Sequence, residues 1–94
     1  MHTENVLTMP RRFDYGFNYE FNKSITAMIN NELVSILTLD CAQMEYIDSV
    51  GIGLLVMAQK KAQAAGKRIE MIKLTDGAKE VLILTNLQKI IQFT

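Results

Sequence analysis

Strand-like and helix-like segments alternate along this chain. Residues 6–9 form a short apolar run that ends at Pro10, and residues 34–39 form a longer one, Val-Ser-Ile-Leu-Thr-Leu. Because the second run is short, β-branched and mostly apolar, it predicts a strand buried on both faces, as in a parallel sheet. Residues 68–73 predict a second inner strand. This alternation predicts an α/β fold in which a mixed, mostly parallel β-sheet packs against α-helices.

Helical periodicity marks three further segments, at residues 21–30, 51–65 and 77–84. Thr75 or Asp76 can cap the third of them. Residues 87–93 predict a last short helical turn or strand that closes the core. The residues expected to face the core are Phe13, Phe17, Phe21, Ile25, Met28 and Ile29, then Gly51, Leu54, Leu55, Ala58, Ala62 and Ala65, and finally Ala78, Val81, Leu82 and Leu84.

Length and charge limit what the chain can be. Its 94 residues predict one domain, residues 1–94. Lys+Arg and Asp+Glu both count 10, so the formal net charge is +0 and no global field attracts nucleic acid or an anionic membrane. Residues 1–9 lack the apolar centre of a secretory signal, and no run approaches the roughly 18 apolar residues of a spanning helix. We therefore expect a cytoplasmic protein without membrane insertion or direct contact with nucleic acid.

Residues 46–55, Tyr-Ile-Asp-Ser-Val-Gly-Ile-Gly-Leu-Leu, contain the start of the longest predicted helix. Asp48 or Ser49 can cap it, because a short side-chain oxygen accepts hydrogen bonds from the unpaired N–H groups of a first helical turn. In either case a serine hydroxyl stands at the positive end of a helix, at the surface.

The outer face of this helix is apolar where a solvent-facing side is normally polar. It becomes basic only at Lys60 and Lys61, more than two turns after Ser49. An apolar patch beside an exposed serine predicts a docking surface for a protein partner, unless another element of the same chain covers it. The residues predicted to form this surface are Asp48, Ile52, Gly53, Val56, Met57 and Lys60.

Catalytic chemistry has little support in the sequence. A nucleophilic serine needs a positioned base, and the single histidine, His2, lies at the terminus. The single cysteine, Cys41, has no partners at metal-ligand spacing, and the chain has no phosphate-binding loop. We therefore predict no enzyme activity, no metal and no cofactor. A small enzyme or nucleotide-binding domain is the least supported alternative.

A regulatory role for Ser49 requires much less. A phosphoryl group would add roughly −1.5 to −2 charges, which the N-terminus of a helix tolerates. A partner that had desolvated the neighbouring apolar patch would instead meet a buried charge. A loss of about 3 kcal/mol would weaken such binding more than a hundredfold. A plain helix cap is the alternative interpretation of Asp48 and Ser49.

Two blocks of the sequence resemble the core of a STAS domain of the bacterial anti-sigma factor antagonist family. The first is Leu-Thr-Leu-Asp at residues 37–40, and the second is Met-Glu-Tyr-Ile-Asp-Ser-Val-Gly-Ile-Gly-Leu-Leu at residues 44–55. The family pattern is a buried strand ending in Asp, a loop, then Asp-Ser-Ser/Thr-Gly and an aliphatic helix. Gly-Lys-Arg-Ile at residues 66–69 and the aliphatic spacing of residues 81–91 also match. The resemblance covers the chain from about residue 6.

This resemblance implies a phosphorylation switch. In the family, a partner kinase that is also the anti-sigma factor phosphorylates the serine after the Asp, and a PP2C-type phosphatase removes the phosphate. The unphosphorylated antagonist binds the kinase and frees the sigma factor. By position, the implied phosphorylation site is Ser49, with Asp48 beside it.

The chain departs from the family pattern in two places. Val50 stands where Ser or Thr is common, which leaves Ser49 as the one acceptor hydroxyl of the motif. The N-terminus is also short, so an edge strand is missing or comes from residues 1–4, and an unpaired edge would favour weak homodimerisation. Some relatives are instead subunits of membrane transport complexes that dock on an ATPase or permease. That function remains the main alternative.

Overall fold

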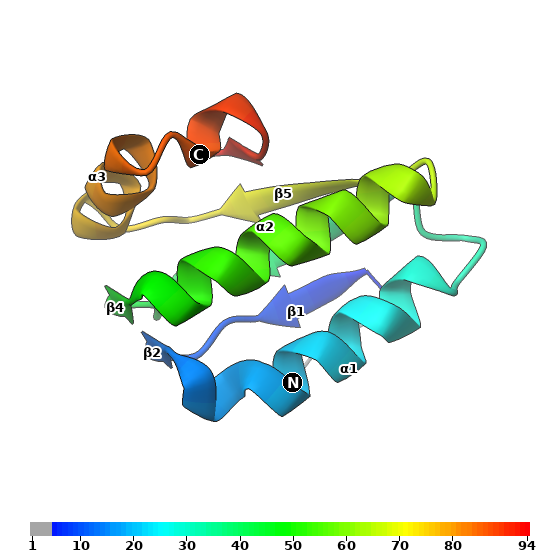
Figure 1. The fold of residues 1–94 in the computed structure, drawn as a ribbon, viewed down its shortest axis with the longest axis horizontal. Coiled ribbons are helices and arrows are strands. Elements are labelled where there is room, and N and C mark those ends of the chain that lie inside the picture. The colour runs from blue at the N-terminus through cyan, green and yellow to red at the C-terminus, as the bar shows by residue number, and fades with distance from the viewer. Residues whose placement is uncertain (1–4) are drawn as a thin grey trace.

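The computed structural model describes residues 5–94 and contains two separate parallel ladders. The main sheet has the strand order β1-β3-β5-β6, and all its pairings are parallel. The second ladder consists of two short strands, β2 and β4, also parallel. Figure 1 shows how these strands lie relative to the helices. The strands are β1 (Val6–Thr8), β2 (Arg12–Phe13), β3 (Ile36–Asp40), β4 (Tyr46–Ile47), β5 (Arg68–Ile72) and β6 (Gln92–Phe93).

Three α-helices connect these strands in the described residues, as the sequence predicted, and each begins slightly earlier than expected. The helices are α1 (Asn18–Ile29), α2 (Ser49–Ala64) and α3 (Asp76–Leu84), with 3-10 turns at η1 (Tyr15–Phe17) and η2 (Leu87–Lys89). Thr75 caps α3 by accepting a hydrogen bond from Ala78 N at 3.2 Å. The predicted α/β fold is confirmed, and the described part of its sheet is entirely parallel.

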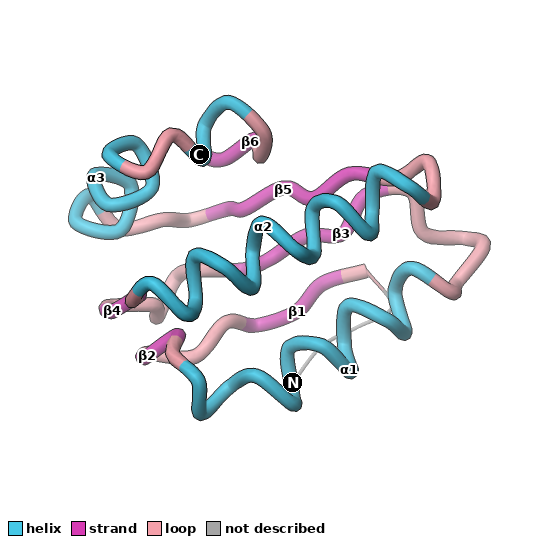
Figure 2. The backbone as a smooth tube through the Cα atoms, viewed as in Figure 1, coloured by secondary structure: helices cyan, strands magenta, loops and turns pink. Residues whose placement is uncertain are grey.

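The helices α1 and α2 lie side by side on one face of the main sheet (Figure 2). The sheet grows in one direction from β1 through β3 to β5. Since βαβ crossovers are right-handed, successive crossovers in one direction place their helices on the same face. The prediction that β3 is buried on both faces is therefore wrong. Its residues alternate between buried and half-buried, with Leu37 and Leu39 facing the helices.

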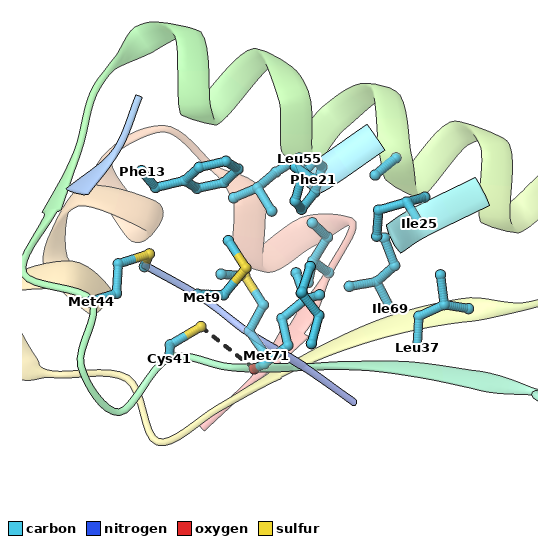
Figure 3. Packing of buried hydrophobic residues seen from close by; sticks show 14 of the residues in the cluster. Met9, Phe13, Phe21, Ile25, Leu37, Cys41, Met44, Leu55, Ile69 and Met71 are labelled. Atoms are coloured by element: carbon cyan, nitrogen blue, oxygen red, sulfur yellow. Dashed lines mark hydrogen bonds between the residues drawn. The ribbon is translucent and has the colours of Figure 1, made fainter. Parts of the chain in front are cut away.

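The core lies between that face of the sheet and the two helices (Figure 3). Phe13 and Phe21 are fully buried, with ring centroids 5.0 Å apart, and Phe17 packs against both. These three residues were predicted to anchor their segment to the core, and the prediction is confirmed. They join β2 to α1, so the β2–β4 ladder is fixed against the same core as the main sheet.

The C-terminal segment differs from the sequence prediction at Leu84 and at Ile90, which is 46% exposed. Leu84 was expected to face the core, but it is 75% exposed, because Ala78 and Leu82 turn the opposite side of α3 inward. Asn86 ends the helix in the left-handed region, with φ at 62°. The predicted terminal piece is both a helical turn and a strand, η2 followed by β6.

The first strand of the described sheet, β1, pairs with β3 and stands at the end of the strand order. The sequence left two alternatives, that an edge strand is missing or that residues 1–4 supply it, and these residues lie outside the described part of the chain. Weak homodimerisation through this edge stays a prediction.

Candidate functional site

The loop before α2 brings Asp48 to the start of that helix. The Asp48 carboxylate accepts a hydrogen bond from the backbone N–H of Gly51, three residues on, at 3.0 Å. Its own backbone N–H donates to the carbonyl oxygen of Phe13 at 3.4 Å. Asp48 is therefore the N-cap, which decides between the two caps that the sequence left open. The backbone hydrogen bond to Phe13 joins the end of β4 to β2.

Ser49 is the first residue of α2, and its side chain is exposed. Because Asp48 already caps the helix, the Ser49 hydroxyl is not needed as a cap, and no side-chain hydrogen bond joins it to residues 5–94. It lies beside the unpaired N–H groups of the first helical turn, where the helix dipole favours negative charge. A plain cap is therefore the role of Asp48, and Ser49 is available for other chemistry.

The predicted docking surface on the outer face of α2 is partly covered by the chain itself. Ile52 and Val56 are half-buried and pack against the core, so only part of each side chain is exposed to solvent. Gly53 is exposed and a Cβ placed there would meet nothing within 4 Å. Met57 is 54% exposed, and Lys60 follows on the same side. Part of the surface is thus an open apolar strip along the first two turns of α2.

Val50 extends this strip and was not expected to do so. Its side chain is 40% exposed, beside Ser49, at the position where the antagonist pattern commonly has Ser or Thr. In the sequence, Val50 stands out only because it lacks the hydroxyl that is common at this position. An aliphatic residue in the first turn of a helix does not by itself indicate a docking surface. Only the exposure of Val50 in the fold identifies it as part of that surface.

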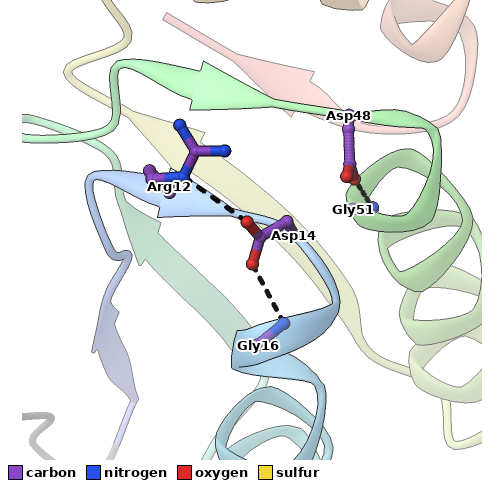
Figure 4. A network of polar contacts seen from close by, with 5 residues as sticks. All are labelled: Arg12, Asp14, Gly16, Asp48 and Gly51. Atoms are coloured by element: carbon purple, nitrogen blue, oxygen red, sulfur yellow. Dashed lines mark hydrogen bonds and ion pairs between the residues drawn. The ribbon is translucent and has the colours of Figure 1, made fainter.

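A group of polar side chains next to Asp48 was also missed (Figure 4). Arg12 lies over the ring of Tyr46, with its guanidinium carbon 4.3 Å from the ring centroid. Its Nε atom is 3.5 Å from the Asp14 carboxylate, which also accepts a hydrogen bond from Gly16 N at 2.9 Å. Two-residue strands have no periodicity that a sequence could display, so the pairing of Arg12 with Tyr46 was not predictable.

The loop residue Cys41 is fully buried, and the pKa of its thiol is raised to about 12. Burial is the larger cause, and the nearby Asp40 carboxylate contributes because it disfavours a second negative charge. Cys41 is thus an unreactive core residue. Within residues 5–94, no group of three or more His, Cys, Asp or Glu side chains is arranged to hold a metal ion. None of the helices described there has the length and apolar character needed to cross a membrane.

Comparison with known proteins identifies the family. A family model described as "Mlab, STAS domain" matches residues 13–92, which include β3, β4, β5 and all three helices. The chain belongs to the STAS domain family. STAS domains are generally non-catalytic regulatory domains, which agrees with the shortage of catalytic groups around Ser49. The resemblance read from the sequence is confirmed at this level.

Solved structures show the same fold at low sequence identity. The anti-sigma factor antagonist SpoIIAA, in its unphosphorylated form, aligns with a TM-score of 0.77 and 18% identity, covering 100% of this STAS domain and 84% of SpoIIAA. The TM1081 protein of Thermotoga maritima aligns with a TM-score of 0.78 and 23% identity over 97% and 80% of the two chains. An anti-sigma factor antagonist (STAS) domain protein from Planctomyces limnophilus aligns with a TM-score of 0.78 and 17% identity, covering 100% of this STAS domain and 85% of that protein.

Proposed function

We propose that this STAS domain is an anti-sigma factor antagonist that acts by partner switching. The unphosphorylated domain binds a serine kinase that is also an anti-sigma factor, and the sigma factor is released. Phosphorylation of Ser49 by that kinase ends the binding, and a PP2C-type phosphatase restores it. The main observation in support is the exposed Ser49 hydroxyl at the first position of α2, next to the open strip of Val50, Gly53 and Met57.

The switch depends on a difference in how the fold and the partner interface respond to a phosphate on Ser49. A phosphate on Ser49 would lie at the positive end of α2, so the fold would tolerate it. A partner that covers Val50 and Met57 would have to bury the same charge or move away from it. The interface would therefore lose several kcal/mol, while the stability of the domain would change little. This difference is what a reversible regulator requires.

The test combines a modification and two substitutions. We expect mass spectrometry of the native protein to find phosphate on Ser49, and the co-purifying partner to be a kinase. Ser49→Ala should bind that partner at all times, whereas Ser49→Asp should fold normally and bind at least a hundredfold more weakly. Ser35→Asp adds the same charge at an exposed serine just before β3, far from α2's first turn, and serves as the control. Equal binding by Ser49→Asp and the wild type would contradict the proposal.

A second candidate is a subunit of a membrane transport complex that docks on its ATPase or permease. The exposed apolar side chains of α2 favour it, because they would serve docking whether or not Ser49 is modified. The outcome that separates the two is the identity of the bound partner. Recovery of an ATPase or permease, with no phosphate on Ser49, would replace the antagonist proposal.

A further inference from the structure

The two short strands β2 and β4 present one polar face to solvent. Arg12 pairs with Tyr46 and Phe13 pairs with Ile47 in the parallel register. Phe13 and Ile47 are buried in the core. Since side chains alternate between the two faces of a strand, Arg12 and Tyr46 face outward. They line a surface depression of about 490 Å³, together with Arg11 and Glu45.

The outward-facing side chains of Arg12 and Tyr46 belong to a row that continues to the phosphorylation site that we propose. Asp14 follows Phe13, and Asp48 follows Ile47, so these two carboxylates extend the outer face by one residue on each strand. Asp14 caps η1 and Asp48 caps α2, so the first turns of the two helical segments start next to each other (Figure 4). Ser49 comes directly after Asp48.

A phosphate at Ser49 would therefore lie beside a row that carries two carboxylates. Asp14 and Asp48 would both repel it. Lys60 lies on the same side of α2 as Ser49, but it is eleven residues further along the helix, which separates the two by about 16 Å. Arg11 is held by Glu45 at 3.0 Å, and no ion pair within residues 5–94 links Lys79 of the neighbouring α3 to this row. Arg12 is the cation that an ion pair joins to this row, through its contact with Asp14.

The contacts of Arg12 leave it able to change partner. Its side chain is 67% exposed, and its link to Asp14 is one Nε contact of 3.5 Å. Exposed ion pairs of this kind contribute little, so exchanging it costs about 1 kcal/mol at most. Its terminal Nη groups make no ion pair or hydrogen bond within residues 5–94. Two adjacent N–H groups of a guanidinium match the oxygens of a phosphate.

We propose that Arg12 binds the phosphoryl group of Ser49 in the phosphorylated protein. Arg12 then gives up its ion pair with Asp14, and Asp14 keeps its hydrogen bond to Gly16. This inference rests on the proposed phosphorylation of Ser49. It adds a second residue to the switch, and that residue comes from β2, 37 positions earlier in the chain. Arg12 is then a positioning residue, which holds the phosphate at the edge of the docking surface and neutralises part of the acidic row.

The experiment places phosphoserine at position 49 by genetic encoding, so that it needs neither the kinase nor the partner. Phosphorus NMR then follows the second ionisation of the phosphate, which is near pH 6 for a free phosphoserine. A bound guanidinium favours the dianion, so we expect the phosphate pKa to rise by about half a unit to one unit in Arg12→Gln. The same shift should shrink at high salt, since the pair is exposed.

Arg11→Gln is the matched control, because it removes the neighbouring arginine, which is paired with Glu45. It should leave the phosphate pKa at the wild-type value. Thermal melting of each variant checks that the fold is intact. If Arg12→Gln and Arg11→Gln titrate alike, the assignment of Arg12 is overturned. Absence of phosphate on Ser49 in the native protein would instead overturn the proposed function, so the two failures are distinguishable.

Discussion

A Cβ atom on Gly51 would lie 2.5 Å from the backbone carbonyl oxygen of Phe13 and 2.9 Å from the Ile47 side chain. The first turn of α2 thus rests directly on the β2–β4 ladder, and only a residue without a side chain fits there. This contact holds the Asp48 cap and the Ser49 hydroxyl in place, because the same Phe13 carbonyl accepts the Asp48 backbone N–H.

Gly51→Ala should destabilise the domain by roughly 1–3 kcal/mol, since backbone and packed side chains must move to admit one methyl group. Gly53→Ala, two residues later in the same helix, should stabilise it by about 0.5–1 kcal/mol, because alanine favours the helix and the space is open. Urea unfolding of both variants measures the difference. Equal effects would mean that α2 does not sit on the ladder in this way.

Lys67→Met should destabilise the domain by about 1–2 kcal/mol. The Lys67 Nζ atom donates hydrogen bonds to the carbonyl oxygens of Ile29 at 2.6 Å and Asn31 at 2.8 Å, with Met28 at 3.4 Å, and so closes the C-terminal end of α1. Lys61→Met, in the exposed last turn of α2, is the control and should change the free energy of unfolding by only a few tenths of a kcal/mol. Denaturant titration compares the two.

The stability of the wild type should fall relative to Cys41→Ala as the pH rises from about 9 to about 12. The folded protein holds the Cys41 thiol proton up to about pH 12, while the unfolded chain loses it near the ordinary value of 9.0. Deprotonation therefore favours the unfolded state in this window, by up to about 1.4 kcal/mol per pH unit. Below pH 9 the difference between the two proteins should be constant.

The same burial predicts that Cys41 reacts slowly with thiol reagents in the folded protein at pH 8 and rapidly after denaturation. Fast labelling under native conditions would show that the loop opens readily.

Met57→Glu should weaken partner binding at least tenfold without changing stability, because Met57 is exposed on the strip beside Ser49. Leu33→Glu is the control: Leu33 is 83% exposed, but it lies in the loop between α1 and β3, away from the start of α2. Calorimetric titration of each variant with the captured partner gives the affinities. Equal losses from both substitutions would argue against a localised docking surface.

Residues 46–55 could be interpreted from the sequence to a useful degree. The helix start, the exposed serine and the apolar outer side were all predictable, because capping and helical periodicity depend on neighbours within four residues. One feature was not. The sequence left open whether the chain covers its own apolar patch, and Ile52 and the next residue on that side, Val56, pack against core residues from distant parts of the chain.

The sequence alone determined the order and type of the three helices and the longer strands, the aromatic core of Phe13, Phe17 and Phe21, and the position of Ser49 at a helix N-terminus. These features follow from local sequence pattern, because the 3.6-residue period of helices and the two-residue period of strands can be recognised within a few neighbouring residues. The tertiary structure decided which face of the sheet is covered, why Gly51 must be glycine while Gly53 need not be, and that Arg12 stands in the row of Asp48. Each of these depends on contacts between residues far apart in sequence, which the local pattern does not record.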